Sequence, residues 1–87
     1  MDDPGGIAIT PNGQTAYVTN ANGNSVTPIN LATNTAGTAI TGGMSDPYAI
    51  AITPNSQSAY VINVSGSSVT PINLATNTAG TAITGGV

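Results

Sequence analysis

Short runs of alternating apolar and polar residues, separated by turn-forming residues, follow one another along the chain. The run from Gly6 to Thr10 is followed by Pro-Asn-Gly, a strong signal for a tight turn between two strands. The run from Thr15 to Asn20 is rich in β-branched and aromatic residues and leads into Asn22-Gly23. Two further runs of the same kind cover Ser25 to Leu31 and Ala36 to Thr41. Strands that recur about every 8–12 residues, with no helical period between them, predict an all-β fold.

The same pattern occurs twice in the sequence, with a constant offset of 43 residues. Residues 3–43 align with residues 46–86, and only 8 of the 41 aligned pairs differ, all in the first half of the unit. A repeat of this length is typical of architectures in which each unit buries its apolar face against a neighbour, and such arrays usually need at least three units. We therefore predict two structural units, residues 3–43 and 46–86, that need further partners.

The faces of these predicted sheets favour a β-propeller. In an ordinary antiparallel sheet one face is polar and solvated, but here the polar positions are mostly Ala and Thr. A four-stranded sheet of about 40–45 residues that is covered on both faces by similar sheets is a propeller blade. The predicted fold class is all-β, with two four-stranded antiparallel blades per chain, completed to a ring by oligomerisation. Pro28 and Pro71 lie inside the third strand of each unit, so we expect incomplete pairing of the fourth strand there, or a bulge.

Composition removes several classes of function. The chain has no Lys, Arg, His, Glu or Cys, and its only charged side chains are Asp2, Asp3 and Asp46. Nucleic-acid binding depends on Lys and Arg, as does attraction to anionic membrane surfaces, so neither partner is expected. No apolar run approaches the roughly 18 residues of a spanning helix, and the acidic N-terminus is unlike a signal peptide. Disulfides and zinc sites are excluded as supports for so small a chain, which leaves oligomerisation.

The best-defined motif is Tyr17-Val18-Thr19-Asn20, which returns as Tyr60-Val61-Ile62-Asn63. Together with Gly6 to Gln14 before it and Ser25 to Asn30 after it, this sequence resembles the YVTN family of β-propeller repeats, and the resemblance covers essentially the whole chain. The family often has Asp-Gly-Lys in the first turn, where this chain has Asn12-Gly13-Gln14. The resemblance implies a secreted or cell-surface propeller, commonly of seven blades. Some relatives of the family resemble lactonases or quinoprotein-like enzymes.

Three residues are candidates for contact with a ligand. Asp3 and Asp46 each precede Pro and the innermost strand, so in a closed ring their copies would form a girdle of carboxylates at the channel mouth. Such a girdle could hold a hard cation such as Ca²⁺, although an Asp-Pro turn between blades is the simpler interpretation. Tyr48 stands where the first unit has Gly5, also near the channel mouth, and serves either a ligand or local packing. We expect Tyr17 and Tyr60 to pack between blades, with their hydroxyls satisfied at an edge.

Catalysis is the function that the sequence opposes most strongly. General acid–base chemistry most often uses His, with Glu, Lys, Tyr or Cys as other options, and only Asp and Tyr are present here. No Ser has a basic partner that could activate it. We therefore predict no catalytic residues, no metal site, no cofactor and no enzymatic activity.

Two blades do not close a ring, and each chain would present two dissimilar apolar faces. Head-to-tail contacts between such faces either close into a ring or continue as a filament. Three chains would give six blades and four chains would give eight, whereas the seven blades common in the family would require one blade to be left out of the ring. The leading hypothesis is a structural module that assembles from copies of itself, either as a fragment of a longer natural array or as an engineered scaffold. The alternative is a binding module that holds a small ligand or cation at the axis of the assembled ring.

Overall fold

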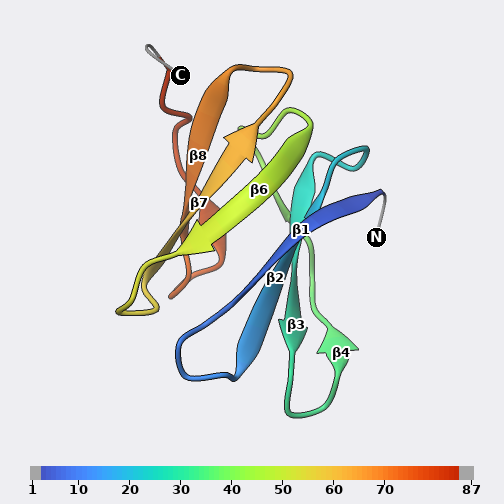
Figure 1. The fold of residues 1–87 in the computed structure, drawn as a ribbon, viewed down its shortest axis with the longest axis vertical. Helices are drawn as coiled ribbons and strands as arrows, with labels where there is room; N and C mark the ends of the chain where they lie inside the picture. The colour runs from blue at the N-terminus through green and yellow to red at the C-terminus, as the bar shows by residue number, and fades with distance from the viewer. Residues whose placement is uncertain (1–2, 85–87) are drawn as a thin grey trace.

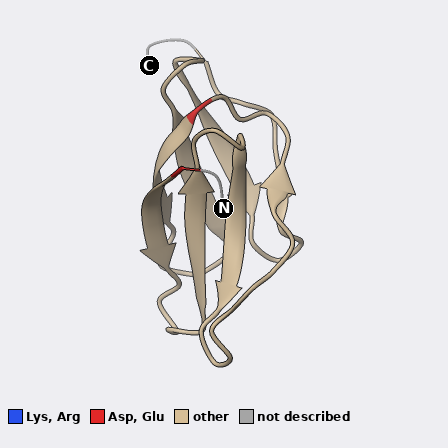
Figure 2. Cartoon of the chain, turned by 90° about the vertical axis from the view of Figure 1, so that its right-hand side faces the viewer, with Lys and Arg blue, Asp and Glu red and all other residues tan. Residues whose placement is uncertain are grey.

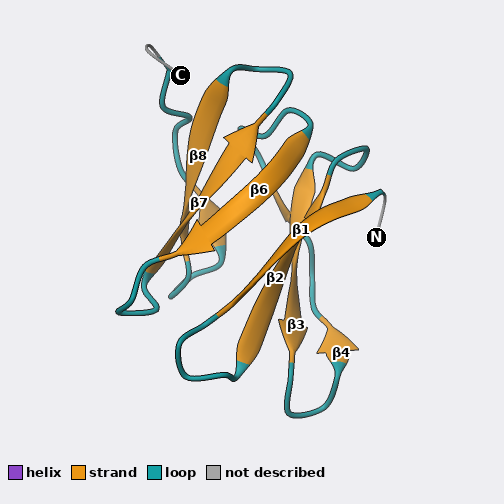
Figure 3. Ribbon diagram, viewed as in Figure 1, coloured by secondary structure: helices purple, strands orange, loops and turns teal. Residues whose placement is uncertain are grey.

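The computed structural model describes residues 3–84 of the chain. These residues form two antiparallel sheets and contain no helix, which confirms the predicted all-β fold (Figure 1, Figure 3). The two sheets follow one another in sequence and pack face against face. We call the first sheet blade 1 and the second sheet blade 2. The predicted end of the second unit at Gly86 lies outside the described residues.

Blade 1 is a meander in which the first four strands pair in order and the fifth returns to pair with the third. Its second strand begins and ends at the predicted residues, and its third ends one residue earlier than predicted. The first strand begins at Pro4 and carries a bulge between Pro4 and Gly6. The strands of blade 1 are β1 (Pro4–Ile9), β2 (Thr15–Asn20), β3 (Ser25–Asn30), β4 (Thr35–Ala36) and β5 (Ile40–Thr41).

Blade 2 repeats this order with the same registers between its second and third strands. Its last segment is shorter, because Val69 and Ile83 form an isolated bridge where blade 1 has β5. The strands of blade 2 are β6 (Pro47–Ile52), β7 (Ser58–Asn63), β8 (Ser68–Asn73) and β9 (Thr78–Ala79).

The fourth strand is interrupted in both blades, and Pro is the reason. The sequence predicts one strand from Ala36 to Thr41, but β4 and β5 pair separately with the two ends of β3. Between them lies the stretch opposite Pro28, which has no N–H to donate to the ladder. The Gly37 N–H still donates to the Pro28 carbonyl at 2.7 Å, and Gly80 does the same to Pro71. The predicted incomplete pairing is therefore confirmed.

The turn between the first two strands is built on an Asn side chain. The Oδ1 of Asn12 accepts hydrogen bonds from the Gln14 N–H at 3.0 Å and from the Thr10 hydroxyl at 2.6 Å. Gly13 follows with φ 73°, a left-handed conformation that glycine adopts without steric cost. The second copy keeps the Asn-centred bonds and places Ser56 at φ 61°. The side-chain bonds, rather than the glycine alone, therefore define this turn.

The two blades contact each other most extensively along β1 and β6, which lie side by side near the middle of the molecule (Figure 1). One apolar cluster fills the space between the sheets, and it takes side chains from both blades and from the connection between them. Its fully enclosed members are Tyr17, Val26, Ile40, Met44, Ala59, Val61 and Ile72. The hydrophobic core of the chain is therefore the interface between its blades.

Candidate functional site

Each blade has two faces, and the strand registers assign every side chain to one of them. We call the two faces A and B. Face A of blade 1 carries Ile7, Ile9, Ala16, Val18, Asn20, Thr27 and Ile29, and face A of blade 2 carries Ile50, Ile52, Ala59, Val61, Asn63, Thr70 and Ile72. Face B of blade 1 carries Gly6, Ala8, Tyr17, Thr19, Val26, Pro28 and Ile40, and face B of blade 2 carries Ala49, Ala51, Tyr60, Ile62, Val69, Pro71 and Ile83.

Within the chain, face B of blade 1 packs against face A of blade 2, and we call this contact the intrachain interface. The Tyr17 hydroxyl crosses it and donates to Asn77 Oδ1 at 2.9 Å. The Thr19 hydroxyl donates to the Tyr48 carbonyl at 2.6 Å. Burial raises the pKa of the Tyr17 phenol above its ordinary value. The expectation that Tyr17 packs between blades with a satisfied hydroxyl is therefore confirmed.

The connection between the blades also docks on face A of blade 2. The Thr70 hydroxyl donates to the Gly43 carbonyl at 2.6 Å, and the Ser45 N–H donates to Asn63 Oδ1 at 3.2 Å. The Asn63 amide in turn donates to the Thr70 hydroxyl at 2.8 Å. Asn63, the last residue of the motif, thus bonds to the third strand through its side-chain nitrogen and to the connection between the blades through its side-chain oxygen.

In the described part of the chain, the other two faces have no blade against them. On face A of blade 1, Ile7 is 62% exposed and Ile9 is 56% exposed. On face B of blade 2, Tyr60 is 42% exposed and Ile62 is 50% exposed. Within residues 3–84, Tyr60 therefore does not pack between blades as the sequence predicts, because no blade of the described residues lies against face B of blade 2. Large apolar side chains gathered on one face indicate an interaction surface.

Face A of blade 1 also contains a buried polar atom without a partner. Among the described residues, no group donates to Asn20 Oδ1, although Asn20 is only 2% exposed. Its amide donates to Ser25 Oγ and to Thr27 Oγ1, as the amide of Asn63 does in blade 2. In blade 2 the Ser45 N–H is the donor to Asn63 Oδ1, and the counterpart of Ser45 in the first unit, Asp2, lies outside the described residues. An unpaired buried acceptor is costly and is normally satisfied in a completed structure.

The three residues predicted at the channel mouth occupy different settings. Asp3 and Asp46 both have positive φ at a bend before the first strand of their blade, and their carbonyls accept from the N–H groups of Ala21 and Val64 at 3.1 Å (Figure 2). Asp46 also lines a hollow of about 440 Å³ together with Ala21, Asn22, Asn24, Ser45 and Ser65. The Asp46 N–H donates to Asn24 Oδ1 at 2.8 Å, and Ser65 donates to the Asp46 carboxylate at 3.5 Å.

Tyr48 lies beside Gly5, its counterpart in the first unit. A Cβ added at Gly5 would lie 3.3 Å from Tyr48 Cδ1, so the tyrosine ring covers the glycine backbone. The ring is nevertheless 58% exposed. Among residues 3–84, no three His, Cys, Asp or Glu residues gather as they would around a metal ion. The carboxylate girdle, which requires further copies of the chain, stays a prediction.

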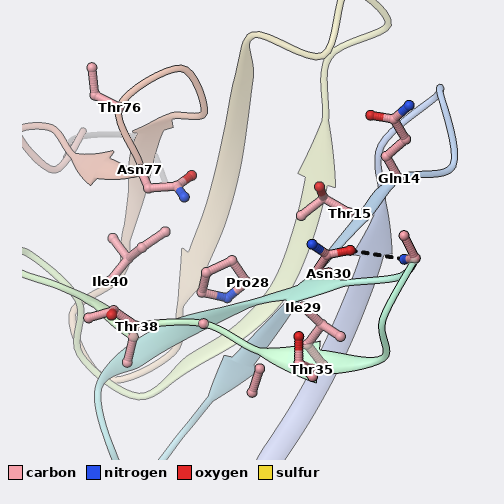
Figure 4. A pocket seen from close by; sticks show the side chains of 14 residues that line it. Gln14, Thr15, Pro28, Ile29, Asn30, Thr35, Thr38, Ile40, Thr76 and Asn77 are labelled. Carbon is pink, nitrogen blue, oxygen red and sulfur yellow. Dashed lines mark hydrogen bonds between the residues drawn. The ribbon is translucent and has the colours of Figure 1, made fainter.

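A larger pocket of about 910 Å³ lies at the outer side of the intrachain interface (Figure 4). Its walls come from β3, β4 and the first turn of blade 1, and from the Thr76-Asn77 turn of blade 2. The labelled side chains are neutral: Gln14, Thr15, Pro28, Ile29, Asn30, Thr35, Thr38, Ile40, Thr76 and Asn77. The pocket was not predictable from the sequence, although the Thr-Asn-Thr segment that precedes each fourth strand contributes to its walls.

Comparison with solved structures shows that the chain has a β-propeller-type fold. It is similar to hydrazine synthase from Kuenenia stuttgartiensis, with a TM-score of 0.89 and 26% identity over 94% of this chain and 23% of that one. It is similar to a protein of unknown function from Desulfotomaculum acetoxidans, with a TM-score of 0.71 and 25% identity over 90% of this chain and 25% of that one. A 6-phosphogluconolactonase-like protein from Bacteroides uniformis matches with a TM-score of 0.79 and 17% identity, over 93% of this chain and 26% of that one.

The chain thus spans about a quarter of the length of these structures. No protein-family model matches it, and no curated protein matches it. The described residues include no helix long and apolar enough to cross a membrane. The fold and the exposed faces define the class: two adjacent blades of a β-propeller, with one uncovered face at each end.

Proposed function

We propose that this chain is a non-enzymatic structural module of the YVTN type, which assembles head-to-tail with copies of itself into a closed β-propeller. One observation carries the proposal: the uncovered face A of blade 1 has the same seven side chains as the covered face A of blade 2. The intrachain interface thus covers face A of blade 2, and each chain exposes the same set of side chains again on face A of blade 1. A face B of blade 2 from another copy is the natural occupant.

A further observation supports the same docking. Ile7 and Ile9 are exposed where Ile50 and Ile52 pack against the core cluster. Full burial of an isoleucine contributes about 1.5–3 kcal/mol, so covering both residues favours association substantially.

Mass in solution tests the proposal. Three copies of the 8.4 kDa chain give about 25 kDa and four give about 34 kDa, whereas a monodisperse species of 8.4 kDa would overturn it. Ile7→Asp places a charge on the uncovered face A and is expected to yield the monomer. Gln14→Glu adds the same charge in the exposed first turn and serves as the matched control, which should assemble as the unmodified chain does.

A second candidate function is ligand binding at the axis of the ring. It is favoured by the exposure of Tyr48 at a position where the other unit has Gly5. In the assembled ring, Tyr48 and the carboxylates of Asp3 and Asp46 would recur around the channel mouth. A rise in melting temperature on addition of millimolar calcium supports a cation there, and Asp46→Asn should abolish that rise. An unchanged melting temperature would remove the cation from consideration.

A further inference from the structure

The two faces B of the chain differ at neighbouring positions, although the two faces A are identical. Gly6 and Thr19 lie directly opposite each other in blade 1, and their counterparts in blade 2 are Ala49 and Ile62. At the other positions that the registers place on face B, only Thr15 and its counterpart Ser58 differ, at the opposite end of the second strand from Thr19. This pair of differences lies at the contact between β1 and β6.

In the intrachain interface, Gly6 and Thr19 together form a tight polar contact with the backbone of blade 2. Thr19 Oγ1 accepts from the Gly6 N–H at 2.9 Å and donates to the Tyr48 carbonyl at 2.6 Å. A Cβ at Gly6 would lie 2.5 Å from the Tyr48 carbonyl oxygen and 3.5 Å from Ala49 Cα. No side chain fits there unless the two blades separate, because the opposing atoms belong to the backbone.

Blade 2 cannot form this contact with a following blade. Ala49 carries the Cβ that the space excludes, and Ile62 lacks the hydroxyl that holds the opposing carbonyl. The ladder between β6 and β7 also passes from Pro47–Asn63 directly to Ile50–Val61, without the pair that corresponds to Gly6–Thr19. In an assembly, the opposing carbonyl would be that of Gly5 in the next copy, which is the counterpart of Tyr48. If the contact between chains had the same geometry as the intrachain interface, the Cβ of Ala49 would therefore overlap with the Gly5 carbonyl of the next copy.

From this difference we infer that the interface between chains is spaced apart at its inner edge by Ala49 and Ile62, and that the ring consequently contains four chains and eight blades. The inference rests on the proposed self-assembly. The first strand of each blade is the innermost strand of a propeller, so a spacer between first strands moves blades apart near the axis. Blades that are farther apart near the axis meet at a smaller angle, and a smaller angle needs more blades to complete the circle. Six blades require an average of 60° per interface and eight require 45°.

Restoring the residues of blade 1 to blade 2 tests this inference. Native mass spectrometry of the unmodified chain should give about 34 kDa, the mass of four 8.4 kDa copies. The double variant Ala49→Gly/Ile62→Thr restores the two blade 1 residues of the inner contact to the uncovered face B, and should shift the mass to about 25 kDa, for three copies. Ala49→Gly alone removes the overlap and should increase the fraction of rings with three chains. This single variant keeps the test valid if the double variant folds poorly.

Ser56→Gly is the matched control. It also restores a blade 1 residue, but in the first turn and away from either face, so the mass should remain about 34 kDa. An unmodified ring of three chains overturns the inference, and so does a ring of four chains that both variants leave unchanged. Each of those results leaves the proposed self-assembly standing. A monomeric unmodified chain overturns the self-assembly itself, and with it the inference.

Discussion

Face A of blade 1 and face A of blade 2 carry identical side chains in different surroundings. In blade 2 these side chains meet Tyr17, Val26 and Ile40 of the other blade, while in blade 1 the most exposed of them, Ile7 and Ile9, meet solvent. The sequence of a repeat therefore defines the chemistry of a face but not whether that face is covered. Coverage depends on the neighbouring unit, as expected for an array whose stability comes from interfaces between units. The difference in the free energy of unfolding between matched substitutions in the two blades therefore measures how much the neighbouring blade contributes to stability.

The largest effect is expected from Tyr17, because its side chain is enclosed between the blades and its hydroxyl bonds to Asn77. Tyr17→Ala should lower the free energy of unfolding by about 3–5 kcal/mol, the usual cost of truncating a buried aromatic residue. Tyr60→Ala removes the same side chain from an uncovered face and should cost less than about 1 kcal/mol. Urea unfolding of both variants in the Ile7→Asp background compares them without assembly. Equal losses would show that the two faces B do not differ in coverage.

A smaller effect is expected from Gly6, where the intrachain interface has no room for a side chain. Gly6→Ala places a Cβ 2.5 Å from the Tyr48 carbonyl oxygen, and the strain should cost about 1–3 kcal/mol. Ala51→Gly makes the reverse exchange on the uncovered face B. It serves as the control for the change in backbone freedom that accompanies any exchange between glycine and alanine. Thermal melts followed by circular dichroism measure both variants. A Gly6→Ala chain as stable as the original would indicate that the blades separate there without cost.

The strands, the turns and the interruption opposite Pro28 were predictable from the sequence, because each follows from local chemistry. Alternation and Asn-Gly turns define strands, and a missing N–H breaks a ladder wherever it occurs. The split of the predicted Ala36–Thr41 strand into β4 and β5 is the one place where the outcome needed the structure, because either a bulge or a gap could absorb the proline.

The candidate site was less predictable, because it depends on contacts between units. The motif Tyr17-Val18-Thr19-Asn20 is visible in the sequence, but the bonds from Thr19 to Tyr48 and from Tyr17 to Asn77 join residues 29 and 60 positions apart. Nothing in the local text shows that Gly6 lies against the Tyr48 carbonyl. The eight differences between the copies are visible in the sequence, but only the packing of the blades shows which of them lie at an interface.

The next effect in size concerns the two Asn residues that end the motif. Asn63 Oδ1 accepts from the Ser45 N–H, whereas nothing in residues 3–84 donates to Asn20 Oδ1. Asn63→Ala should therefore cost about 0.5–1.5 kcal/mol more than Asn20→Ala, the contribution of one hydrogen bond. Chemical unfolding in the Ile7→Asp background measures the difference. Losses of equal size in the two variants would show that the hydrogen bond from Ser45 adds no stability.

The smallest effect is a dependence of stability on alkaline pH. Burial raises the pKa of Tyr17 above the ordinary value of 10.0, so the folded chain holds the phenolic proton more tightly than the unfolded chain does. The stability that this shift contributes is fully present below pH 10.0 and is lost as the pH rises through the folded pKa. Tyr17→Phe removes the titrating group and should flatten this decline, while Tyr60→Phe, on the uncovered face, should leave it in place. A decline of equal slope in both variants would show that the loss of stability does not come from the intrachain interface.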